Sequence, residues 1–469
     1  MQIINTLNGV FWGWLVAGIL LSTGLFFSVR LGFPQIRHFG KLFSCLRDTM
    51  KTEDNSVSGF GALCAALGGQ VGTGSLVGVA TALASGGPGA IFWMWITALL
   101  GMPITFAEAV LGQLFRVKNT DGTYRGGAAY YMERGLKSKV LATLFSLCMI
   151  VAVGVFIAMI QSNSISAALT GVVDFPPIAA GLIVLILTAL VIVGGIKRLS
   201  DVSSYVVPFM ALGYIVISLI IVVMNISRFP AIFSLIFRSA FSMKAVGGGV
   251  VGYTMKEAFR YGVARGLFSN DAGNGAAAGM HATANVKHPV TQGFAAMLGT
   301  FFTTIIICSC TAMCIMFTGA LESGETGIVL TQVAFGNALG SAGKWVVFAA
   351  MALFGFTTLL ADVYYGETNI LFIFKGNTKI VWIYRILLGI LLVVAAVTPV
   401  DTLWSLIDFM AAFLVFFNVI GILGLNKYVV YAIKDYFAQK KKDKNAEPVW
   451  QWEVDVMDMD LSNPGEKQK

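Results

Sequence analysis

The sequence predicts an all-α polytopic membrane protein with eleven transmembrane helices. Hydrophobic residues make up 57% of the 469-residue chain and charged residues only 12%, about half of their share in soluble domains. Apolar runs long enough to cross a bilayer, about 20 residues each, recur along nearly the whole length. The run lengths exclude a β-barrel, whose strands alternate over about ten residues. Two of the runs are interrupted by glycines and polar residues, which points to a function inside the membrane.

The predicted spans follow the apolar runs in chain order. They are 9–31, 57–85, 88–115, 138–170, 177–196, 202–225, 250–285, 289–319, 341–374, 379–399 and 402–433. The segment from Glu322 to Leu339 is amphipathic and too short to span, so we expect an external helix that lies over a binding site. The polar chain from about Gln439 onward is expected to be poorly ordered.

Basic residues orient the spans. They gather after the first, third, fifth, seventh, ninth and eleventh spans, whereas the segment before the first span carries no charge. The positive-inside rule therefore places these loops and the lysine-rich tail in the cytoplasm and the N-terminus outside, in a bacterial inner membrane. The stretch 226–249 departs from the rule, since it carries Arg228, Arg238 and Lys244. No cleavable signal peptide is expected, because the first run is too long and lacks a basic n-region.

Cysteine, histidine and charge usage argue against other classes of protein. Cys308, Cys310 and Cys314 stand in an apolar run without the histidine or carboxylate ligands that a metal site needs. The three histidines, His38, His281 and His288, lie near predicted span ends, which argues against a catalytic constellation and an enzyme. The net charge of +8 is accompanied by no nucleic-acid-binding motif, so we expect the lipid bilayer and no nucleic acid as partner.

The second span is broken in its middle. It contains Gly68-Gly-Gln-Val-Gly-Thr-Gly74, with four glycines in seven residues beside a glutamine and a threonine. Each glycine costs about 1 kcal/mol of helix propensity. Unwound backbone at membrane depth is tolerated only where it lines a cavity or binds a ligand. Close glycine packing between helices is the alternative, but it does not account for Gln70 and Thr73 in the same stretch.

The seventh span repeats this pattern at Phe268-Ser-Asn-Asp-Ala-Gly-Asn-Gly275. Each break lies in the first of five spans, and a repeat of five spans inverts its topology in the second copy. The predicted organisation is an N-terminal helix with cytoplasmic connector (1–56), a first five-helix repeat (57–225), an external connector (226–249), a second repeat (250–433) and a cytoplasmic tail (434–469). Paired broken helices in inverted halves indicate the binding site of a secondary transporter.

The two kinds of half-helix end attract different groups. N-terminal ends present free N–H groups that suit a carboxylate. C-terminal ends present carbonyl oxygens that suit a small hard cation such as Na⁺. A zwitterionic amino acid transported with Na⁺ as coupling ion fits both ends, and one chain contains both breaks, so we expect the monomer to be sufficient.

Several motifs resemble those of the alanine/glycine:cation symporter family, also called sodium:alanine symporters. They are Gly72-Thr-Gly74, Gly86-Gly-Pro-Gly-Ala-Ile-Phe-Trp-Met-Trp95, Gly126-Gly-Ala-Ala-Tyr-Tyr-Met-Glu-Arg-Gly135, Gly194-Gly-Ile-Lys-Arg198, the stretch 262–275 and His281-Ala-Thr-Ala-Asn285. The resemblance implies a leucine-transporter-type fold, ten core helices in two inverted fives plus one N-terminal helix, within the amino acid–polyamine–organocation superfamily. It also implies Na⁺-coupled uptake of alanine or glycine. Gln70 and Ser75 depart from the family's usual asparagines, and Ala128-Ala129 from its usual Pro-Met pair, which leaves the substrate open.

The resemblance implies where the cation binds. Folds of this type hold Na⁺ between carbonyls of the first broken helix and two hydroxyls of the eighth core helix. In this chain these are the carbonyls of Gly68 and Val71 and the hydroxyls of Thr357 and Thr358. Oxygen ligands suit a hard cation. Adjacent threonines in a helix also bond back to their own helix, which is the alternative interpretation.

The substrate site is predicted from the same two breaks. Backbone N–H groups near Thr73 and Gly74 are expected to meet the carboxylate. The amino group needs acceptors, for which the candidates are the side chains of Gln70, Gln161 and Asn274 and the carbonyls of Phe268, Ser269 and Asn270. The Phe268 ring is expected to cover the substrate's side chain. Gln161 can equally join two helices, and Phe268 can equally be a packing residue.

Other functions are weighed against Na⁺ symport. Glu108, Asp271 and Asp362 are predicted inside the membrane, where a proton-coupled mechanism would need one of them to titrate. Uptake of glutamine or another polar neutral amino acid is the alternative for the substrate. A channel would need rings of equivalent groups, which two unlike broken helices do not supply.

Overall fold

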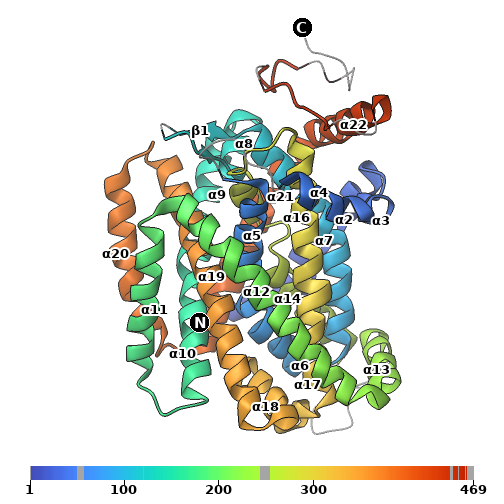
Figure 1. Ribbon diagram of the computed structural model, residues 1–469, viewed down its shortest axis with the longest axis vertical. Helices are drawn as coiled ribbons and strands as arrows, with labels where there is room; N and C mark the ends of the chain where they lie inside the picture. Colours follow the sequence, from blue (N-terminus) through green and yellow to red (C-terminus); the bar gives the residue numbers. More distant parts are fainter. Residues whose placement is uncertain are drawn as a thin grey trace.

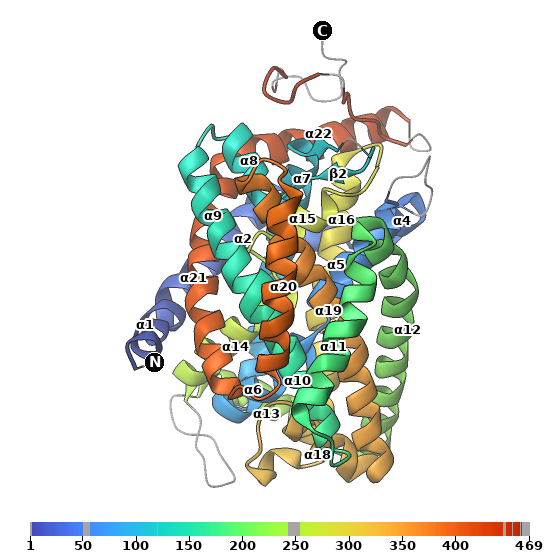
Figure 2. The ribbon, with the colours of Figure 1, turned by 90° about the vertical axis from the view of Figure 1, so that its left-hand side faces the viewer.

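The structure is a computed structural model that describes residues 2–49, 57–119, 121–242, 254–443, 447–452, 454–459 and 461. Its described part is helical apart from a short antiparallel pair of strands, β1 (Val117–Lys118) and β2 (Tyr124–Arg125), and an isolated bridge between Val57 and Ala284. Most helices run along the long axis and form one bundle (Figures 1 and 2). The prediction of an all-α protein is therefore confirmed.

Seven helical stretches of the described chain are long and apolar enough to cross a membrane, which makes the chain a multi-pass membrane protein. They are α7 (Gly89–Leu114), α9–η3–α10 (Lys139–Thr170), α12 (Gly195–Met224), α16–η5–α17 (Pro289–Phe317), α19 (Ser341–Ile373), α20 (Thr378–Ala395) and α21 (Val400–Gly424). An eighth forms if α5 (Gly59–Gln70) is joined to η2 and α6 (Gly74–Gly86), which are bent against each other by 45°.

The remaining helices are shorter. The N-terminal helix runs through α1 (Gln2–Val10), η1 (Phe11–Leu15) and α2 (Val16–Arg30) and is followed by α3 (Pro34–Arg37) and α4 (Phe39–Thr49). Between the long helices lie α8 (Ala128–Arg134), α11 (Pro177–Ile192), η4 (Ile226–Arg228), α13 (Phe229–Phe241), α14 (Met255–Asn270), α15 (Ala276–His281), η6 (Ala320–Ser323) and α18 (Gly327–Leu339). The last helix is α22 (Asn426–Lys442).

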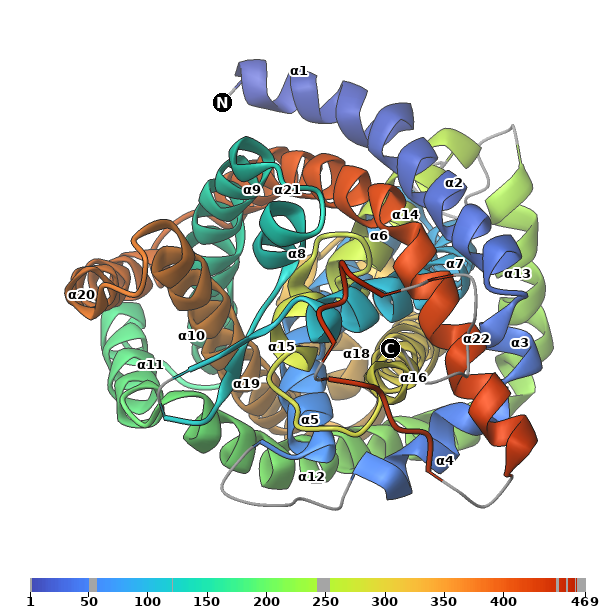
Figure 3. The same ribbon diagram turned by 90° about the horizontal axis from the view of Figure 1, so that it is seen from above.

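Viewed from above, α5, α15 and α19 lie toward the middle of the bundle, whereas α11 and α20 form a pair on one side and α1–α2 lies on the outer edge (Figure 3). The N-terminal helix is held there by two hydrogen bonds to α21. Asn8 Nδ2 donates to Ser405 O at 2.9 Å, and Trp12 Nε1 donates to Asp408 O at 2.9 Å. The N-terminal helix is thus fixed at the outer edge of the bundle.

Glycines on α7 let the second broken span approach closely. A Cβ on Gly112 would stand 2.4 Å from the carbonyl oxygen of Ala278, and one on Gly101 would stand 2.8 Å from Ala272 Cβ. Real side chains never come so near, so these two contacts require glycine. Close backbone approach through small residues is the usual packing of membrane helices.

Three predicted segments look different in the structure. The connector 226–249 contains the helix α13, which packs on α7 through the Trp93 Nε1 bond to Ala240 O at 3.3 Å; Lys244 lies outside the described residues. The eleventh span was predicted to run to residue 433, but α21 ends at Gly424 and α22 is a separate helix.

The expectation of a poorly ordered chain from Gln439 onward is wrong for residues 447–452. The backbone N–H of Trp450 donates to Lys287 O at 2.8 Å, and Glu447 forms a 2.6 Å ion pair with Lys287. Trp450 is buried and packs against His288. Charge content indicated disorder, but two tryptophans provide enough apolar surface to hold the segment on the bundle.

Candidate functional site

The first break separates α5 from η2 at Val71–Thr73. Val71 leaves the helical conformation with φ −86° and ψ 72°, and η2 begins as a π-helix at Gly74. A Cβ on Gly72 would stand 2.2 Å from Thr358 Oγ1. A glycine is therefore needed at position 72 for the close contact with α19. The break also leaves backbone N–H and C=O groups without helix partners, so that they can bind other groups.

The predicted cation ligands come together around the carbonyl oxygen of Gly68. Thr358 Oγ1 lies 2.7 Å and Thr357 Oγ1 lies 3.3 Å from this atom. The Thr357 hydroxyl also lies 3.1 Å from Phe354 O, so it bonds back to its own helix as well. Val71, the other predicted carbonyl ligand, caps the C-terminal end of α5. None of the described hydrogen bonds joins its carbonyl oxygen to Thr357 or Thr358. Three oxygens from two helices, without a nitrogen donor between them, fit a hard cation such as Na⁺.

The second break follows α14 and depends on three left-handed residues. Asp271, Gly273 and Gly275 have φ values of 57°, 91° and 85°. Asn274 holds the turn, because its Nδ2 donates to Asp271 Oδ1 at 2.7 Å and its Oδ1 accepts from the N–H of Ala276 at 2.8 Å. The side chain of Asn274 is thus engaged within the break, and its role toward substrate stays a prediction.

The two breaks contact each other directly. A Cβ on Gly74 would stand 2.9 Å from Ser269 Cα and 3.2 Å from the Phe268 ring. Gln70 Nε2 donates to the carbonyl oxygen of Asn270 at 3.0 Å. Five of the eight predicted substrate residues therefore meet at one junction, and two more, Thr73 and Gln161, also reach it.

Gln161 reaches this junction from α10. Its Oε1 accepts the backbone N–H of Thr73 at 3.2 Å. The backbone amide of Thr73 was predicted to meet the substrate carboxylate, and Gln161 was predicted to meet the amino group. In the structure these two groups are hydrogen-bonded to each other. Gln161 lies in α10 opposite the start of the half-helix η2. Its burial in the membrane is explained by this contact, because its side chain satisfies a backbone donor that the break leaves free.

Three buried polar atoms at the junction have no hydrogen-bond partner among the described residues: Thr73 Oγ1, Ser75 Oγ and Asn270 Nδ2. Each side chain is fully buried or nearly so. An unpaired buried polar group costs about 1–3 kcal/mol. Two possible acceptors and a donor in one place suit a small solute that itself carries donors and acceptors.

Sequence reasoning missed a wall of the junction that comes from α16–η5–α17. Thr303 Oγ1 donates to Gln70 Oε1 at 3.4 Å, Cys308 Sγ lies 2.9 Å from Ser269 Oγ, and Thr311 Oγ1 donates to Ser75 O at 2.8 Å. These residues recur at intervals that put them on adjacent faces of one helix. That polar stripe in an apolar run was the available signal.

A second missed group stands beside Phe268. The Trp404 ring lies 4.7 Å from the Phe268 ring at a steep angle, and the Arg265 guanidinium lies 4.1 Å above Trp404. Arg265 forms a buried ion pair with Asp408 at 2.6 Å. The Phe268–Trp404 ring pair therefore lies beside a charge pair on α14 and α21. Arg265 Nη2 is paired with Asp408, whereas its Nε and Nη1 have no hydrogen-bond partner among the described residues.

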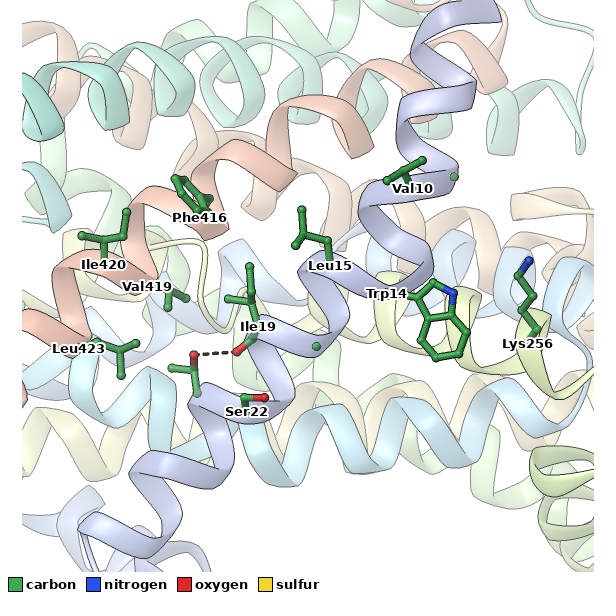
Figure 4. A pocket seen from close by; sticks show the side chains of 13 residues that line it. Val10, Trp14, Leu15, Ile19, Ser22, Lys256, Phe416, Val419, Ile420 and Leu423 are labelled. Carbon is green, nitrogen blue, oxygen red and sulfur yellow. Dashed lines mark hydrogen bonds between the residues drawn. The ribbon is translucent and has the colours of Figure 1, made fainter.

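One groove of the described structure lies away from the junction. A groove of about 890 Å³ runs between the N-terminal helix and α21, where Val10, Leu15, Ile19 and Phe416 line it (Figure 4). Lys256 and Trp14 stand at one end of it (Figure 4). Its wall is mostly aliphatic and faces outward, which suits lipid chains and not a polar solute.

Comparison with known proteins shows the family of the chain. The model of the sodium:alanine symporter family matches residues 1–450. A Bacillus subtilis protein described as a putative sodium/proton-dependent alanine carrier is 40% identical over 459 residues, which cover 94% of this chain and 93% of the relative. A probable sodium/glutamine symporter of the same organism is 37% identical, with 95% and 92% covered.

Among solved structures, a manganese transporter of Eremococcus coleocola superposes with a TM-score of 0.51 over 87% of this chain and 85% of its own, at 14% identity. This likeness concerns the fold alone. The sequence match covers nearly the whole chain, including both breaks and the threonine pair. The chain therefore belongs to the sodium:alanine symporter family, a family of secondary transporters and not of enzymes.

Proposed function

We propose that this protein carries a small neutral amino acid, with alanine and glycine first, into the cell together with Na⁺. The observation that carries the proposal is the junction of the two breaks, where a three-oxygen cluster lies next to unpaired buried polar atoms. Transport proceeds by alternating access around this junction.

The cation occupies the position between the Gly68 and Val71 carbonyls and the hydroxyls of Thr357 and Thr358. In the described structure the Thr358 hydroxyl donates its hydrogen to Gly68 O. When Na⁺ binds, the hydroxyl rotates, so that its hydrogen leaves Gly68 O and its lone pairs face the ion. The cluster joins the first break to α19. Binding of Na⁺ therefore orders the same backbone that the amino acid contacts, and each ligand raises the affinity for the other.

The amino acid lies against Thr73 and Gly74 on one side and Phe268 to Asn270 on the other. Its carboxylate replaces Gln161 Oε1 as acceptor of the Thr73 N–H, which frees the glutamine oxygen for the amino group. A neutral side chain is supported by the ion pair of Arg265 with Asp408, because the charge of this arginine is already balanced. A small side chain is supported by the close approach of Gly74 to Ser269.

Glutamine is the second candidate, supported by the 37% identity to a probable sodium/glutamine symporter. Gln70 and Ser75, which depart from the family's usual residues, stand at the junction and would bond a side-chain amide. The wall residues Thr303 and Cys308 belong to the same polar surface.

The proposed architecture has eleven spans, with two inverted repeats of five after the N-terminal helix. This number is supported by adding α2, α11 and the α14–α15 pair to the eight long or bent spans. The N-terminus is outside and the C-terminal helix α22 is cytoplasmic, because the basic loops lie at the α22 end of the bundle. One chain contains every residue of the junction, so a monomer is sufficient.

Uptake into proteoliposomes tests this function. Purified protein is reconstituted, and radiolabelled alanine, glycine and glutamine are supplied with an inward Na⁺ gradient or with choline. Uptake of at least one of them should require the Na⁺ gradient. If none enters in a Na⁺-dependent manner, the proposal is wrong. If uptake is observed, competition by all twenty amino acids ranks the substrates.

A further inference from the structure

A buried carboxylate braces the second break from α7. Glu108 is fully buried, and its Oε1 accepts the backbone N–H of Gly275 at 3.1 Å and the Asn418 Nδ2 at 2.5 Å. Asn418 also donates to the carbonyl oxygen of Gly273 at 2.9 Å and accepts from the hydroxyl of Tyr131. The network joins α7, α8 and α21 to the two left-handed glycines of the break.

The second oxygen of this carboxylate has no hydrogen-bond partner among the residues that the structure describes. Glu108 Oε2 is buried without a hydrogen bond to any described residue, and no described lysine or arginine pairs with Glu108. The titratable groups that interact with it electrostatically are Asp271 in the break, Tyr131 on α8 and Tyr365 on α19, none of which is cationic. A buried charge without compensation is too costly to keep through a transport cycle.

The surroundings favour a proton over a metal ion as the compensating charge. The groups around Oε1 are N–H donors, whose positive ends point at the carboxylate and repel a metal cation. Na⁺ would need several oxygen ligands, and the described residues contain no group of three acidic, histidine or cysteine side chains placed to hold a metal ion. A proton needs only the one free oxygen.

We propose that Glu108 is a proton-binding residue whose Oε2 takes up a proton from one side of the membrane and releases it to the other during transport. In the step a water-borne proton adds to the carboxylate and forms an O–H bond, with no other bond changed. Release reverses it. This inference rests on the proposed transport function and adds a second coupling ion to it.

Protonation changes how firmly the break is held. The ionised carboxylate accepts charge-assisted hydrogen bonds from Gly275 and Asn418, and these are about twice as strong as neutral ones. A neutral carboxyl group holds α15 and α21 less tightly. Substrate contacts the other end of the same break at Ser269 and Asn270, so the proton and the amino acid act on one movable segment.

Proton flux in wild-type proteoliposomes is the first test. Pyranine trapped inside reports internal pH while radiolabelled alanine enters down a Na⁺ gradient. Internal acidification that follows alanine uptake, and stops without alanine, is expected. Alanine uptake driven by Na⁺ with no accompanying proton flux overturns the inference and leaves Na⁺ symport intact. Uptake driven by a pH gradient alone refutes Na⁺ symport but supports the proton site if Glu108→Gln abolishes it.

Variants identify the residue. Glu108→Gln should lose the proton flux relative to alanine flux and the pH dependence of uptake, whereas Glu108→Asp keeps a carboxyl group and should keep both with a shifted pH profile. Tyr131→Phe is the matched control, because it weakens the same network without removing the carboxyl group, and its proton-to-alanine ratio should stay at the wild-type value. An unchanged ratio in Glu108→Gln assigns the proton elsewhere and overturns the inference.

Discussion

The hydroxyl of Thr358 offers a sharp test of the cation site. It lies 2.7 Å from Gly68 O and packs directly on Gly72. Thr358→Val keeps the branched shape and removes the oxygen, so the contact with Gly72 is preserved. Thr358→Ser keeps the oxygen and removes a methyl group. The pair of variants therefore separates the loss of a ligand from the loss of packing.

The size of the effect follows from the contacts. One hydroxyl bound to a charged group contributes about 1.5 kcal/mol, which corresponds to roughly a tenfold higher Na⁺ concentration for half-maximal uptake in Thr358→Val. Thr357 already shares its hydroxyl with Phe354 O at 3.1 Å, so it must give up that bond to reach Na⁺. We expect Thr357→Ala to raise the Na⁺ concentration for half-maximal uptake by only about threefold, which corresponds to roughly 0.7 kcal/mol.

The assay is initial alanine uptake into proteoliposomes over a series of Na⁺ concentrations at constant ionic strength. Protein amount and melting temperature in detergent, measured for each variant, control for folding. Thr358→Ser should stay close to wild type. If Thr358→Val and Thr357→Ala both keep the wild-type Na⁺ dependence, the two hydroxyls are not ligands, and the threonines only bond back to their helix.

Three other predictions concern a close backbone contact, a buried ion pair and the C-terminal segment. Gly74→Ala should lower uptake by at least about tenfold because its Cβ would meet the backbone of the second break, whereas Gly213→Ala, with no atom within 4 Å of its Cβ, should transport normally in the same assay. Asp408→Ala should destabilise the protein by about 3 kcal/mol, since it strands the buried Arg265; an unchanged melting temperature would contradict this. Trp450→Ala should expose the C-terminal segment to limited proteolysis, and equal cleavage of wild type and variant would show that the tryptophan does not hold it.

The sequence was sufficient to locate the breaks because helix interruption in a membrane has a strong local signature. Four glycines near Gln70, and the Asn-Asp-Ala-Gly run after Ser269, cost helix stability that only tertiary contacts or a ligand restore. The structure has its bend at the first and its left-handed residues at the second. The proximity of Thr358 to Gly68 was implied by family resemblance and not by spacing, since 290 residues separate them.

What the sequence did not indicate depends on side-chain direction between distant helices. Cys308 was predicted to stand in an apolar run without a metal site, yet its sulfur lies 2.9 Å from Ser269 Oγ. Glu108 was recognised as a membrane acid, but its partners Gly275 and Asn418 are 167 and 310 residues away. Such pairings depend on helix rotation, which hydropathy leaves undetermined when a helix is buried on most sides.

In the proposed mechanism, Gln161 connects the cation cluster to the substrate. Its Oε1 accepts the Thr73 N–H, so in the proposed mechanism a substrate carboxylate displaces it before the amide serves as anion donor. The displaced oxygen becomes an acceptor at the moment when the amino group arrives. Gly68, whose carbonyl bonds Thr358, stands only five residues before Thr73 in the same interrupted segment. In the proposed mechanism the ion therefore fixes one end of this segment while the substrate and Gln161 exchange partners at the other. Because Gln161 is uncharged, the exchange adds no charged protein side chain to the buried junction.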